Sequence, residues 1–373
     1  MKRLWMSVMV IVSLFFLVNA SSAEADGLFL YSGGTYSTIG GPGAGGLSDV
    51  AINNAGQIVG NYPSASGTQS FLYSGGIYST ISFPGATSSG VAGINDAGQI
   101  LGEYSSVLGN YGFLYSGGIY STISPPGATD SYVGAINNAG QILGIAWSAS
   151  GQYAFLDSGG TYSTISFPGA TQTAADAINN AGQIVGTYTN ASGGISAFLY
   201  SGGTYSTISP PGATTAGYTK PVAINDAGQI VGYYSGAAGG LYYFLDSGGT
   251  YSTISFPGAL SSSTTILAIN NTGQIVGDYY AEGPQAFGPQ AFLYSGGTYS
   301  TISPPGATYS WAYDINNAGS SSQIVGYYAV YSPSSVPEPA TVVFLSVGLL
   351  GLVGFWKKLG PQSITKDNGV TSG

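Results

Sequence analysis

The stretch AFLYSGGTYSTIS occupies residues 197–209, and close copies of it recur through the body of the chain. A second phrase, AINNAGQIVG, alternates with it. The phenylalanines of the first phrase are spaced by 42, 42, 42, 43, 46 and 48 residues, and a nearly constant period of this length indicates a repeat architecture. They are Phe29, Phe71, Phe113, Phe155, Phe198, Phe244 and Phe292, and the isoleucines of the second phrase are Ile52, Ile94, Ile136, Ile178, Ile224, Ile269 and Ile315.

Each repeat contains four short segments that are typical of β-strands. FLY and TYSTI flank Ser-Gly-Gly, whose glycines supply the positive φ angles of a hairpin turn. AIN and QIVG flank Asn-Ala-Gly, in which Asn can bond its own backbone and Gly can take the left-handed position. Val, Ile, Tyr, Thr and Phe dominate the four segments, and the body shows no helical period. Pro-Gly after TYSTIS, as at Pro84-Gly85, ends the hairpin and begins a loop.

Four strands in each repeat, seven times over, predict an all-β fold, a seven-bladed β-propeller. The body opens with a FLY–TYSTI half repeat at 29–39 and finishes with an INN–QIVG half repeat at 315–328. We expect the two halves to pair as the last blade and to close the ring, which leaves few free strand edges. A β-solenoid is the alternative, and it would favour distinct capping repeats.

The composition excludes several classes of function. The 373-residue chain has 61 Gly, 30 Tyr and 6% charged residues, and it has neither Cys nor His. A disulfide framework, a thiolate nucleophile and the commonest zinc ligands are therefore missing, and we expect no metal and no cofactor. The net charge is −9, and Lys220 is the only basic residue between Asp26 and Ser335. Nucleic-acid binding is not expected, because it needs Lys or Arg to neutralise phosphates.

The N-terminus is typical of a secretory signal peptide. A basic start, MKR, precedes an apolar run at 4–18, and Ala23 and Ala25 form an A-x-A cleavage site. We therefore expect signal peptidase to cut after Ala25, so that the mature protein begins at Asp26. An uncleaved membrane anchor is the alternative.

The C-terminus contains a second apolar run, at 340–356, between a Pro-Glu-Pro triplet and two lysines. At about 1.5 Å per residue the run is just long enough for a short helical membrane span, and the lysines favour a cytoplasmic end. The residues of the motif are Pro337, Glu338, Pro339, Lys357 and Lys358.

This order of triplet, span and basic end closely resembles the PEP-CTERM sorting signal of Gram-negative bacteria. The resemblance implies that an exosortase recognises and processes the tail, and it implies a link to exopolysaccharide. The family usually ends soon after the basic residues, whereas GPQSITKDNGVTSG follows here at 360–373. A plain anchor in the inner membrane is the alternative.

The order AIN-x-x-GQIVG, followed by AFLY-SGG, resembles the HAF repeats of bacterial extracellular proteins. The usual His is absent before Phe, and Tyr or Asp stands where that family has Trp. The resemblance concerns structural motifs and implies no defined activity.

The acidic and glycine-rich candidates are better explained by structure than by chemistry. Asp157 and Asp246 replace Tyr in the FLY phrase and are expected to be exposed hairpin residues, in blades too far apart to act as a pair. Asp96 and Asp226 replace Asn in INNAG and are expected to be turn residues, without the dense spacing of a calcium loop. GPGAGG at 41–46 matches G-x-G-x-x-G, but a strand-like segment follows it, which predicts a loop. No catalytic residue is assigned, because the chain has no G-x-S-x-G and no His to pair with a serine.

Aromatic residues are the remaining candidates for ligand binding. Seven equivalent phrases build the ring, so specific chemistry should lie where the repeats differ, between GAT and AIN or between QIVG and FLY. Flat rings with a polar tip suit sugar faces, and Asn, Ser and Thr suit sugar hydroxyls. Ordinary packing between blades is the alternative for each ring. The candidate ligand-loop aromatics are Trp147, Trp311, Tyr62, Tyr104, Tyr132 and Tyr218.

These observations predict four segments: a signal peptide (1–25), a repeat propeller (26–331), a sorting and transmembrane segment (332–360) and a polar tail (361–373). The expected function is that of an exported, non-catalytic protein of the cell surface or extracellular matrix that binds or organises exopolysaccharide. It would be anchored, transiently or permanently, by its C-terminal segment in the inner membrane. A propeller enzyme acting on extracellular glycans, for example a lyase using Tyr and an acid, and an envelope protein–protein scaffold are the alternatives.

Overall fold

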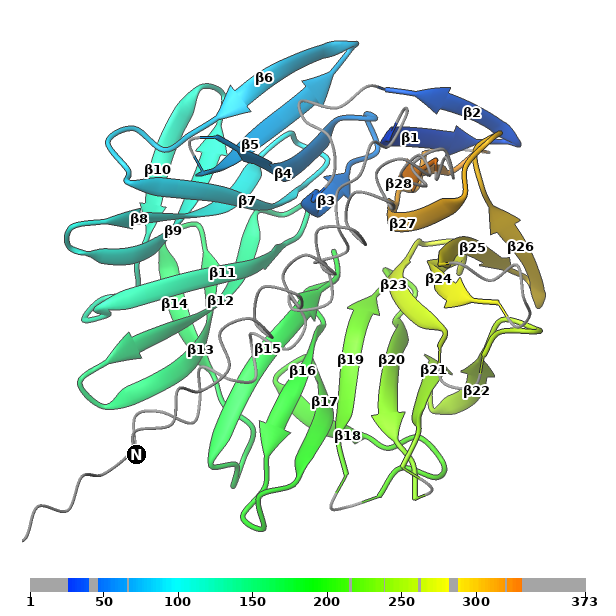
Figure 1. The fold of residues 1–373 in the computed structure, drawn as a ribbon. Helices are drawn as coiled ribbons and strands as arrows, with labels where there is room; N and C mark the ends of the chain where they lie inside the picture. The colour runs from blue at the N-terminus through cyan, green and yellow to red at the C-terminus, as the bar shows by residue number, and fades with distance from the viewer. Residues whose placement is uncertain are drawn as a thin grey trace, which may run out of the picture. The chain divides into compact units, whose positions relative to one another are not determined.

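The fold of the repeat body is a ring of seven four-stranded antiparallel sheets, as the repeats predict (Figure 1). The computed structural model describes residues 26–39, 46–65, 67–214, 217–237, 239–260, 263–281, 288–318 and 321–330. The predicted signal peptide with Ala23 and Ala25, the C-terminal segment with its Pro-Glu-Pro triplet and lysines, and residues 40–45 of the glycine-rich stretch lie outside these residues. Within the described ranges, no helix could span a membrane. The ring of blades excludes the solenoid alternative.

Each blade runs from an inner strand at the ring axis to an outer strand at the rim (Figure 1). The inner strands are β3 (Ser48–Ile52), β7 (Ser88–Ile94), β11 (Asp130–Ile136), β15 (Gln172–Ile178), β19 (Thr219–Ile224), β23 (Thr265–Ile269) and β27 (Tyr309–Ile315). The second strands are β4 (Ile58–Ser64), β8 (Ile100–Ser106), β12 (Gln141–Ser148), β16 (Ile184–Thr189), β20 (Gln229–Ser235), β24 (Ile275–Tyr280) and β28 (Gln323–Ala329). The third strands are β5 (Gly67–Ser74), β9 (Gly109–Ser116), β13 (Gly151–Ser158), β17 (Ile195–Ser201), β21 (Leu241–Ser247), β25 (Pro289–Ser295) and β1 (Gly27–Ser32). The outer strands are β6 (Ile77–Ile81), β10 (Ile119–Ile123), β14 (Thr161–Ile165), β18 (Thr204–Ile208), β22 (Thr250–Ile254), β26 (Thr298–Ile302) and β2 (Thr35–Thr38).

We number the blades from β3–β6 as blade 1 to β23–β26 as blade 6. Blade 7 has the order β2-β1-β28-β27, so its two outer strands come from the N-terminal half repeat and its two inner strands from the C-terminal one. Strand β1 pairs with β28 from Gly27↔Tyr328 to Ser32↔Gln323. The predicted closure of the ring by the two half repeats is therefore correct.

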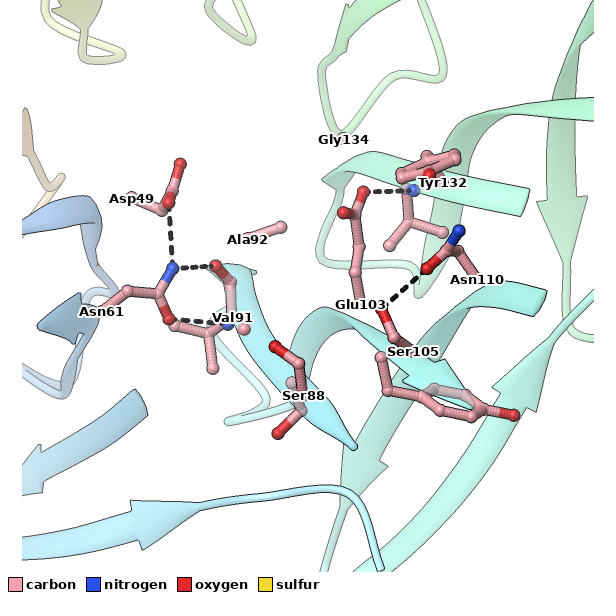
Figure 2. A pocket seen from close by; sticks show the side chains of 14 residues that line it. Asp49, Asn61, Ser88, Val91, Ala92, Glu103, Ser105, Asn110, Tyr132 and Gly134 are labelled. Atoms are coloured by element: carbon pink, nitrogen blue, oxygen red, sulfur yellow. Dashed lines mark hydrogen bonds between the residues drawn. The ribbon is translucent and has the colours of Figure 1, made fainter. Parts of the chain in front are cut away.

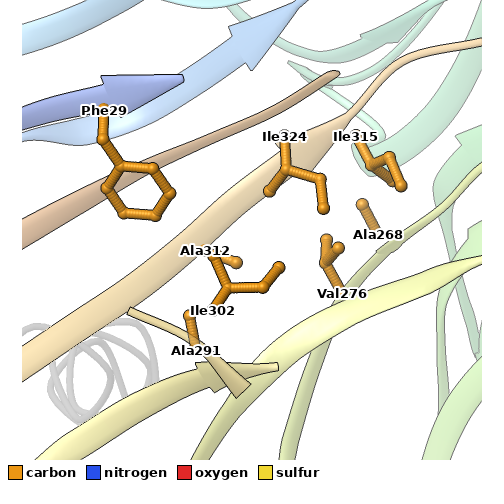
Figure 3. Close-up of a cluster of buried hydrophobic side chains, with 8 residues drawn as sticks. All are labelled: Phe29, Ala268, Val276, Ala291, Ile302, Ala312, Ile315 and Ile324. Carbon is orange, nitrogen blue, oxygen red and sulfur yellow. The ribbon is translucent and has the colours of Figure 1, made fainter. Parts of the chain in front are cut away.

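The hydrophobic core lies between neighbouring blades, and the phenylalanine of each repeat is its largest buried side chain. In Figure 3, Phe29 of β1 points toward Ile324 of β28 and Ile302 of β26, in a cluster that joins blades 6 and 7. The glycine of QIVG leaves room for the ring. At Gly144, an added Cβ would lie 2.5 Å from the ring of Phe155 and 2.3 Å from the carbonyl oxygen of Tyr132.

The first Asn of INN is buried in every repeat and bonds to the next repeat. Asn137, for example, accepts the N–H groups of its own turn through Oδ1 and donates from Nδ2 to the carbonyl of Asn179 at 3.0 Å. The seven side-chain amides form a closed ring of such bonds, between 2.9 and 3.3 Å long, through Asn53, Asn95, Asn137, Asn179, Asn225, Asn270 and Asn316.

The residues at the second Asn position of INN form another closed ring of hydrogen bonds, and these residues are exposed. In each repeat its backbone N–H donates to the side-chain oxygen of the equivalent residue in the next blade, at 2.5 to 2.9 Å. The members are Asn54, Asp96, Asn138, Asn180, Asp226, Asn271 and Asn317. Asp96 and Asp226 are therefore turn residues, as expected, and they also join neighbouring blades.

The tyrosine of TYSTI joins blades near the rim. The hydroxyl of Tyr120 accepts from the N–H of Ser82 at 3.2 Å, and Tyr36 of blade 7 accepts from Ser303 of blade 6 at 3.0 Å. Most of the remaining copies do the same, and Tyr78 instead donates to the carbonyl of Ile39. The repeated phrases thus carry the bonds between blades as well as the strands.

Replacing Asn137 with Ala is expected to lower the free energy of unfolding by about 3 kcal/mol, because turn N–H groups and the Asn179 carbonyl lose their buried partner. The matched change Asn138→Ala, in the exposed ring, should lower it by about 1 kcal/mol or less. Urea unfolding of the two variants measures the difference, and equal losses would contradict a structural role for the buried ring.

Two aspartates differ from the expectation. Asp157 and Asp246 are buried, with 6% and 7% of their surface exposed, and are not the exposed hairpin residues that the sequence predicted. Their Oδ1 atoms accept the N–H groups of Gly160 and Gly249, at 2.6 and 2.7 Å. The carboxylate bonds to the tight Ser-Gly-Gly turn and is therefore held inward against the blade.

The conserved and variable parts of the repeat lie at opposite ends of the blades. In an antiparallel sheet the first and third turns lie at one end, and these are the Asn-Ala-Gly and Ser-Gly-Gly turns. The hairpins between second and third strands and the connections between blades lie at the other end, which we call the loop face. The segments that the sequence analysis singled out for specific chemistry are therefore gathered on one side of the ring.

Candidate functional site

A cavity of about 360 Å³ lies toward the loop face of blades 1 to 3. Its walls come from β3, β4, β7, β8, β9 and β11, and they are mainly backbone and polar side chains. Figure 2 shows Asp49 and Asn61 on one side of the cavity and Glu103 and Tyr132 on the other. The polar lining residues include Asp49, Asn61, Ser88, Ser89, Glu103, Ser105 and Asn110, with Tyr104 and Tyr132 as the aromatic members.

Asp49 occupies an unusual backbone conformation at the edge of this cavity. Its φ is 51°, and it is the only non-glycine residue with a positive φ among those described. The bulged start of β3 sets this conformation. Its Oδ2 accepts from Asn61 Nδ2 at 2.9 Å and from the hydroxyl of Ser48 at 2.8 Å, and no hydrogen bond to a described residue engages Oδ1. Strained backbone of this kind often accompanies functional sites.

Glu103 projects from β8 on the opposite wall. Its Oε1 accepts the N–H of Val133 at 3.2 Å, and Oε2 makes no hydrogen bond within the described part of the chain. Burial raises the pKa of Glu103 to about 7, against the lowering effect of the Val133 N–H, and the charge of Asp49 raises the pKa further. The carboxyl group is therefore poised to gain or lose a proton near neutral pH.

The position of Glu103 follows from a recurring feature of the ring. Every inner strand has a β-bulge or a similar shift of register against its neighbour. In three blades, the side chain that follows QIVG accepts a backbone N–H beside the bulge of the next blade. Asn61 bonds Val91 in this way, Glu103 bonds Val133, and Asp278 bonds Ala312.

Tyr132 and Tyr104 are the two predicted aromatics that line the cavity. Tyr132 lies beside Glu103, and burial together with the charges of Glu103 and Asp130 raises its pKa. Tyr104 stacks on Phe83 with ring centroids 3.7 Å apart, and its hydroxyl contacts Thr122 at 3.0 Å. Phe83 therefore covers one face of Tyr104, whereas the described ring contact of Tyr132 is an edge-on one with Trp147, at 5.3 Å.

The other predicted aromatics are divided among several blades. Trp147 contacts Tyr132 and so adjoins the cavity without lining it. Tyr62 packs beside Phe71 in the core between blades 7 and 1. Tyr218 and Trp311 lie in blades 5 and 7, where they contact other tyrosines. The structure therefore brings together three of the six, and their role in binding stays a prediction.

A second acidic group lies in another part of the ring. Asp176 is the bulge residue of β15, and its Oδ1 lies 3.4 Å from the ammonium of Lys220. Burial raises the pKa of Asp176 and Lys220 lowers it, while Oδ2 is buried without a hydrogen-bond partner in the described structure. This ion pair engages Lys220, and no basic residue is among the described residues that line the cavity beside Glu103.

Sequence reasoning missed Asp49 and Glu103, although the variable segments that hold them were identified. The signal was available for Glu103, because its position after QIVG is occupied by Asn, Ile, Thr, Tyr or Asp in other repeats. Within the described ranges, no three acidic side chains are grouped so that they could hold a metal ion.

The fold and the site define a closed seven-bladed β-propeller with a polar, acid-lined cavity on its loop face. The chain also carries the PEP-CTERM protein-sorting motif, whose model matches residues 335–358. The motif implies an exported protein whose C-terminus is sorted by an exosortase. No curated protein matches the chain.

Several solved structures are similar in fold. One from a study of two prolyl endopeptidases has a TM-score of 0.54 at 12% identity, covering 76% of this chain and 49% of that one. The β-propeller domain of the trilobed protease from Pyrococcus furiosus, described as having an open velcro topology, has a TM-score of 0.52 at 9% identity, with coverages of 76% and 97%. A streptogramin B lyase has a TM-score of 0.46 at 13% identity, with coverages of 83% and 100%. These likenesses concern the fold alone.

Proposed function

We propose that this exported propeller binds glycan in the cavity that blades 1 to 3 form. It would act as a protein of the cell surface or extracellular matrix that organises exopolysaccharide. The cavity itself is the observation that carries the proposal: amide, hydroxyl and carboxyl groups line it together with Tyr132. Sugars present hydroxyl groups at their edges and C–H groups on their faces, and this lining offers a partner to each. The resemblance of the chain to HAF repeats and to PEP-CTERM proteins of exopolysaccharide systems agrees with this function.

Replacing Tyr132 with Ala is expected to weaken glycan binding by about fivefold, the loss of roughly 1 kcal/mol for one aromatic contact. Tyr242→Ala is the matched control, because Tyr242 is 39% exposed on the loop face but lies in blade 5. A glycan array, followed by calorimetric titration of the best ligand, measures both. Equal weakening by the two variants, or none by Tyr132→Ala, would contradict binding in this cavity.

Processing at both ends follows from the same proposal. We expect the exported protein to begin at Asp26 and to lose its tail near Pro337–Pro339 in cells that have an exosortase. Mass spectrometry of the protein from cells with and without exosortase tests this. An intact tail in both would favour the plain membrane anchor.

A glycan-acting enzyme is the second candidate, and the group of Asp49, Glu103 and Tyr132 is the observation that favours it. A carboxyl group with a pKa of about 7 can serve as a general acid beside a carboxylate. Incubating the protein with glycans that bind to it, and comparing Glu103→Ala, would show whether new chain ends are produced. Absence of turnover for bound glycans would leave the binding protein as the function.

A further inference from the structure

We propose that the cavity selects glycans that carry free amino groups, such as partly de-N-acetylated hexosamine chains, over neutral and acidic ones. This inference rests on the proposed function and adds the chemical class of the ligand. It follows from the charge of the cavity wall and from the two carboxylate oxygens that have no hydrogen-bond partner among the described residues.

Among the described residues, the cavity wall has acidic groups and no basic ones. Asp49 and Glu103 contribute carboxyl groups, and neither Lys nor Arg lines the cavity. Lys220, the only basic residue of the body, lies in blade 5 beside Asp176. An acidic glycan would therefore approach carboxylates without a counter-charge, which costs free energy, whereas an ammonium group would supply that counter-charge.

Both carboxyl groups are held in place and keep one oxygen available. Asn61 and Ser48 fix Asp49 through Oδ2, which leaves Oδ1 without a described partner. The N–H of Val133 fixes Glu103 through Oε1, which leaves Oε2 without a described hydrogen-bond partner. A carboxylate that is already oriented loses little conformational freedom on binding, so a charge-assisted bond from an ammonium group is strong here.

Because the surroundings of Glu103 alter its pKa, the preference for amino glycans should depend on pH. The titratable groups near it are Asp49 of β3, Tyr104 of β8, Tyr111 of β9, and Asp130 and Tyr132 of β11. Because burial raises the pKa of Glu103 to about 7, the carboxyl is largely protonated below that pH, and an ammonium group stabilises its ionised form. Binding of an amino glycan should therefore release a proton and become stronger as the pH rises from about 5 toward neutrality, until the amine of the glycan itself loses its proton.

The test compares three oligosaccharides of equal length: a glucosamine oligomer, its N-acetylated counterpart and an oligouronate. We expect the full-length protein to bind the glucosamine oligomer at least about tenfold more tightly than the N-acetylated one, and to bind the oligouronate most weakly. Added salt should reduce the preference. Equal binding of the first two, or preference for the oligouronate, would overturn the inference while leaving glycan binding in place.

The variants keep the shape of the site and remove its charge. Glu103→Gln retains an acceptor for Val133, and Asp49→Asn is tolerated at a positive φ. Each should remove most of the preference for the amino oligomer, and Glu103→Gln should also remove the strengthening of binding as the pH rises from about 5. Asp96→Asn is the control for net charge, since Asn occupies the equivalent position in Asn54 and Asn138.

The outcomes separate this inference from the proposed function. If Glu103→Gln and Asp49→Asn bind as the unaltered protein does, the carboxyl groups do not select the ligand and the inference is wrong. If Asp96→Asn changes the preference equally, the effect comes from net charge and the inference is also wrong. If none of the three oligosaccharides nor any arrayed glycan binds, the proposed function fails as well.

Discussion

Deletion of residues 26–39 is expected to open the ring, to lower the melting temperature by well over ten degrees and to cause aggregation. The deletion removes β1 and β2, so the edge of β28 that pairs with β1 at six positions loses its partner strand, while β27 stays on the other edge. It also removes Phe29 from the core between blades 6 and 7, and Leu28 from the core between blades 7 and 1. Loss of one large core side chain alone costs about 3–5 kcal/mol, and here two interfaces lose their packing together.

The control restores the same residues at the other end of the chain. Asp26 lies beside Val330, whose N–H donates to its carboxylate at 3.3 Å, so a copy of 26–39 placed after residue 330 needs only a short connection. We expect this rearranged chain to regain the melting temperature of the parent. Thermal unfolding and small-angle scattering of the deletion, the rearranged chain and the parent measure the effect. A deletion that melts like the parent would contradict closure of the ring by blade 7.

The repeat determined how much of this architecture the sequence could predict. Strand content, the number of blades and the pairing of the half repeats follow from the period and from the incomplete units at the two ends. The rings of bonds between blades do not, because Asn137 and Asn179 are 42 residues apart and meet only once the ring exists. A turn motif predicts where an Asn bonds locally, and Asn137 does cap its own turn, but the second bond belongs to the tertiary structure.

For the candidate site, too, the sequence predicts the region but not the role of each residue. The variable segments between the repeated phrases do line a cavity, and Tyr104 and Tyr132 are among its lining residues. Single-residue roles were less predictable: Tyr104 is covered by Phe83, which the alternating SFPG loop supplies. Asp49 gave no sequence signal, since its importance comes from a bulged strand and a positive φ. Such features depend on strand register, which hydrophobic alternation sets only approximately.

The stability of the propeller is expected to fall as the pH rises from about 4 to about 8, and Asp278→Asn should remove much of that fall. Burial raises the pKa of Asp278 from 3.8 to about 8, and the N–H of Ala312 lowers it only in part. The folded state therefore holds a proton that the unfolded state has released over this interval. Stability is complete below the unfolded pKa and is lost as the pH rises through the folded one, by up to about 1.4 kcal/mol per pH unit.

Asn61 explains why asparagine is the right substitution at this position. Residues 61 and 278 both follow QIVG, and both accept the N–H of a bulged inner strand through Oδ1. Asn61 also donates from Nδ2 to the carbonyl of Val91 at 2.9 Å. A protonated Asp278 is neutral, as Asn61 is, whereas an ionised one would bury a negative charge.

Asp278→Asn therefore keeps an acceptor for the Ala312 N–H and stays neutral at every pH, and it should be the more stable protein above about pH 8, by a few kcal/mol. Glu103 and Asp314, whose pKa values burial raises to about 7 and about 6, would leave a smaller residual dependence. Urea unfolding at several pH values, with Asp96→Asn as the control at an exposed position, measures the difference. If both variants follow the pH profile of the parent, Asp278 does not hold a proton in the folded protein.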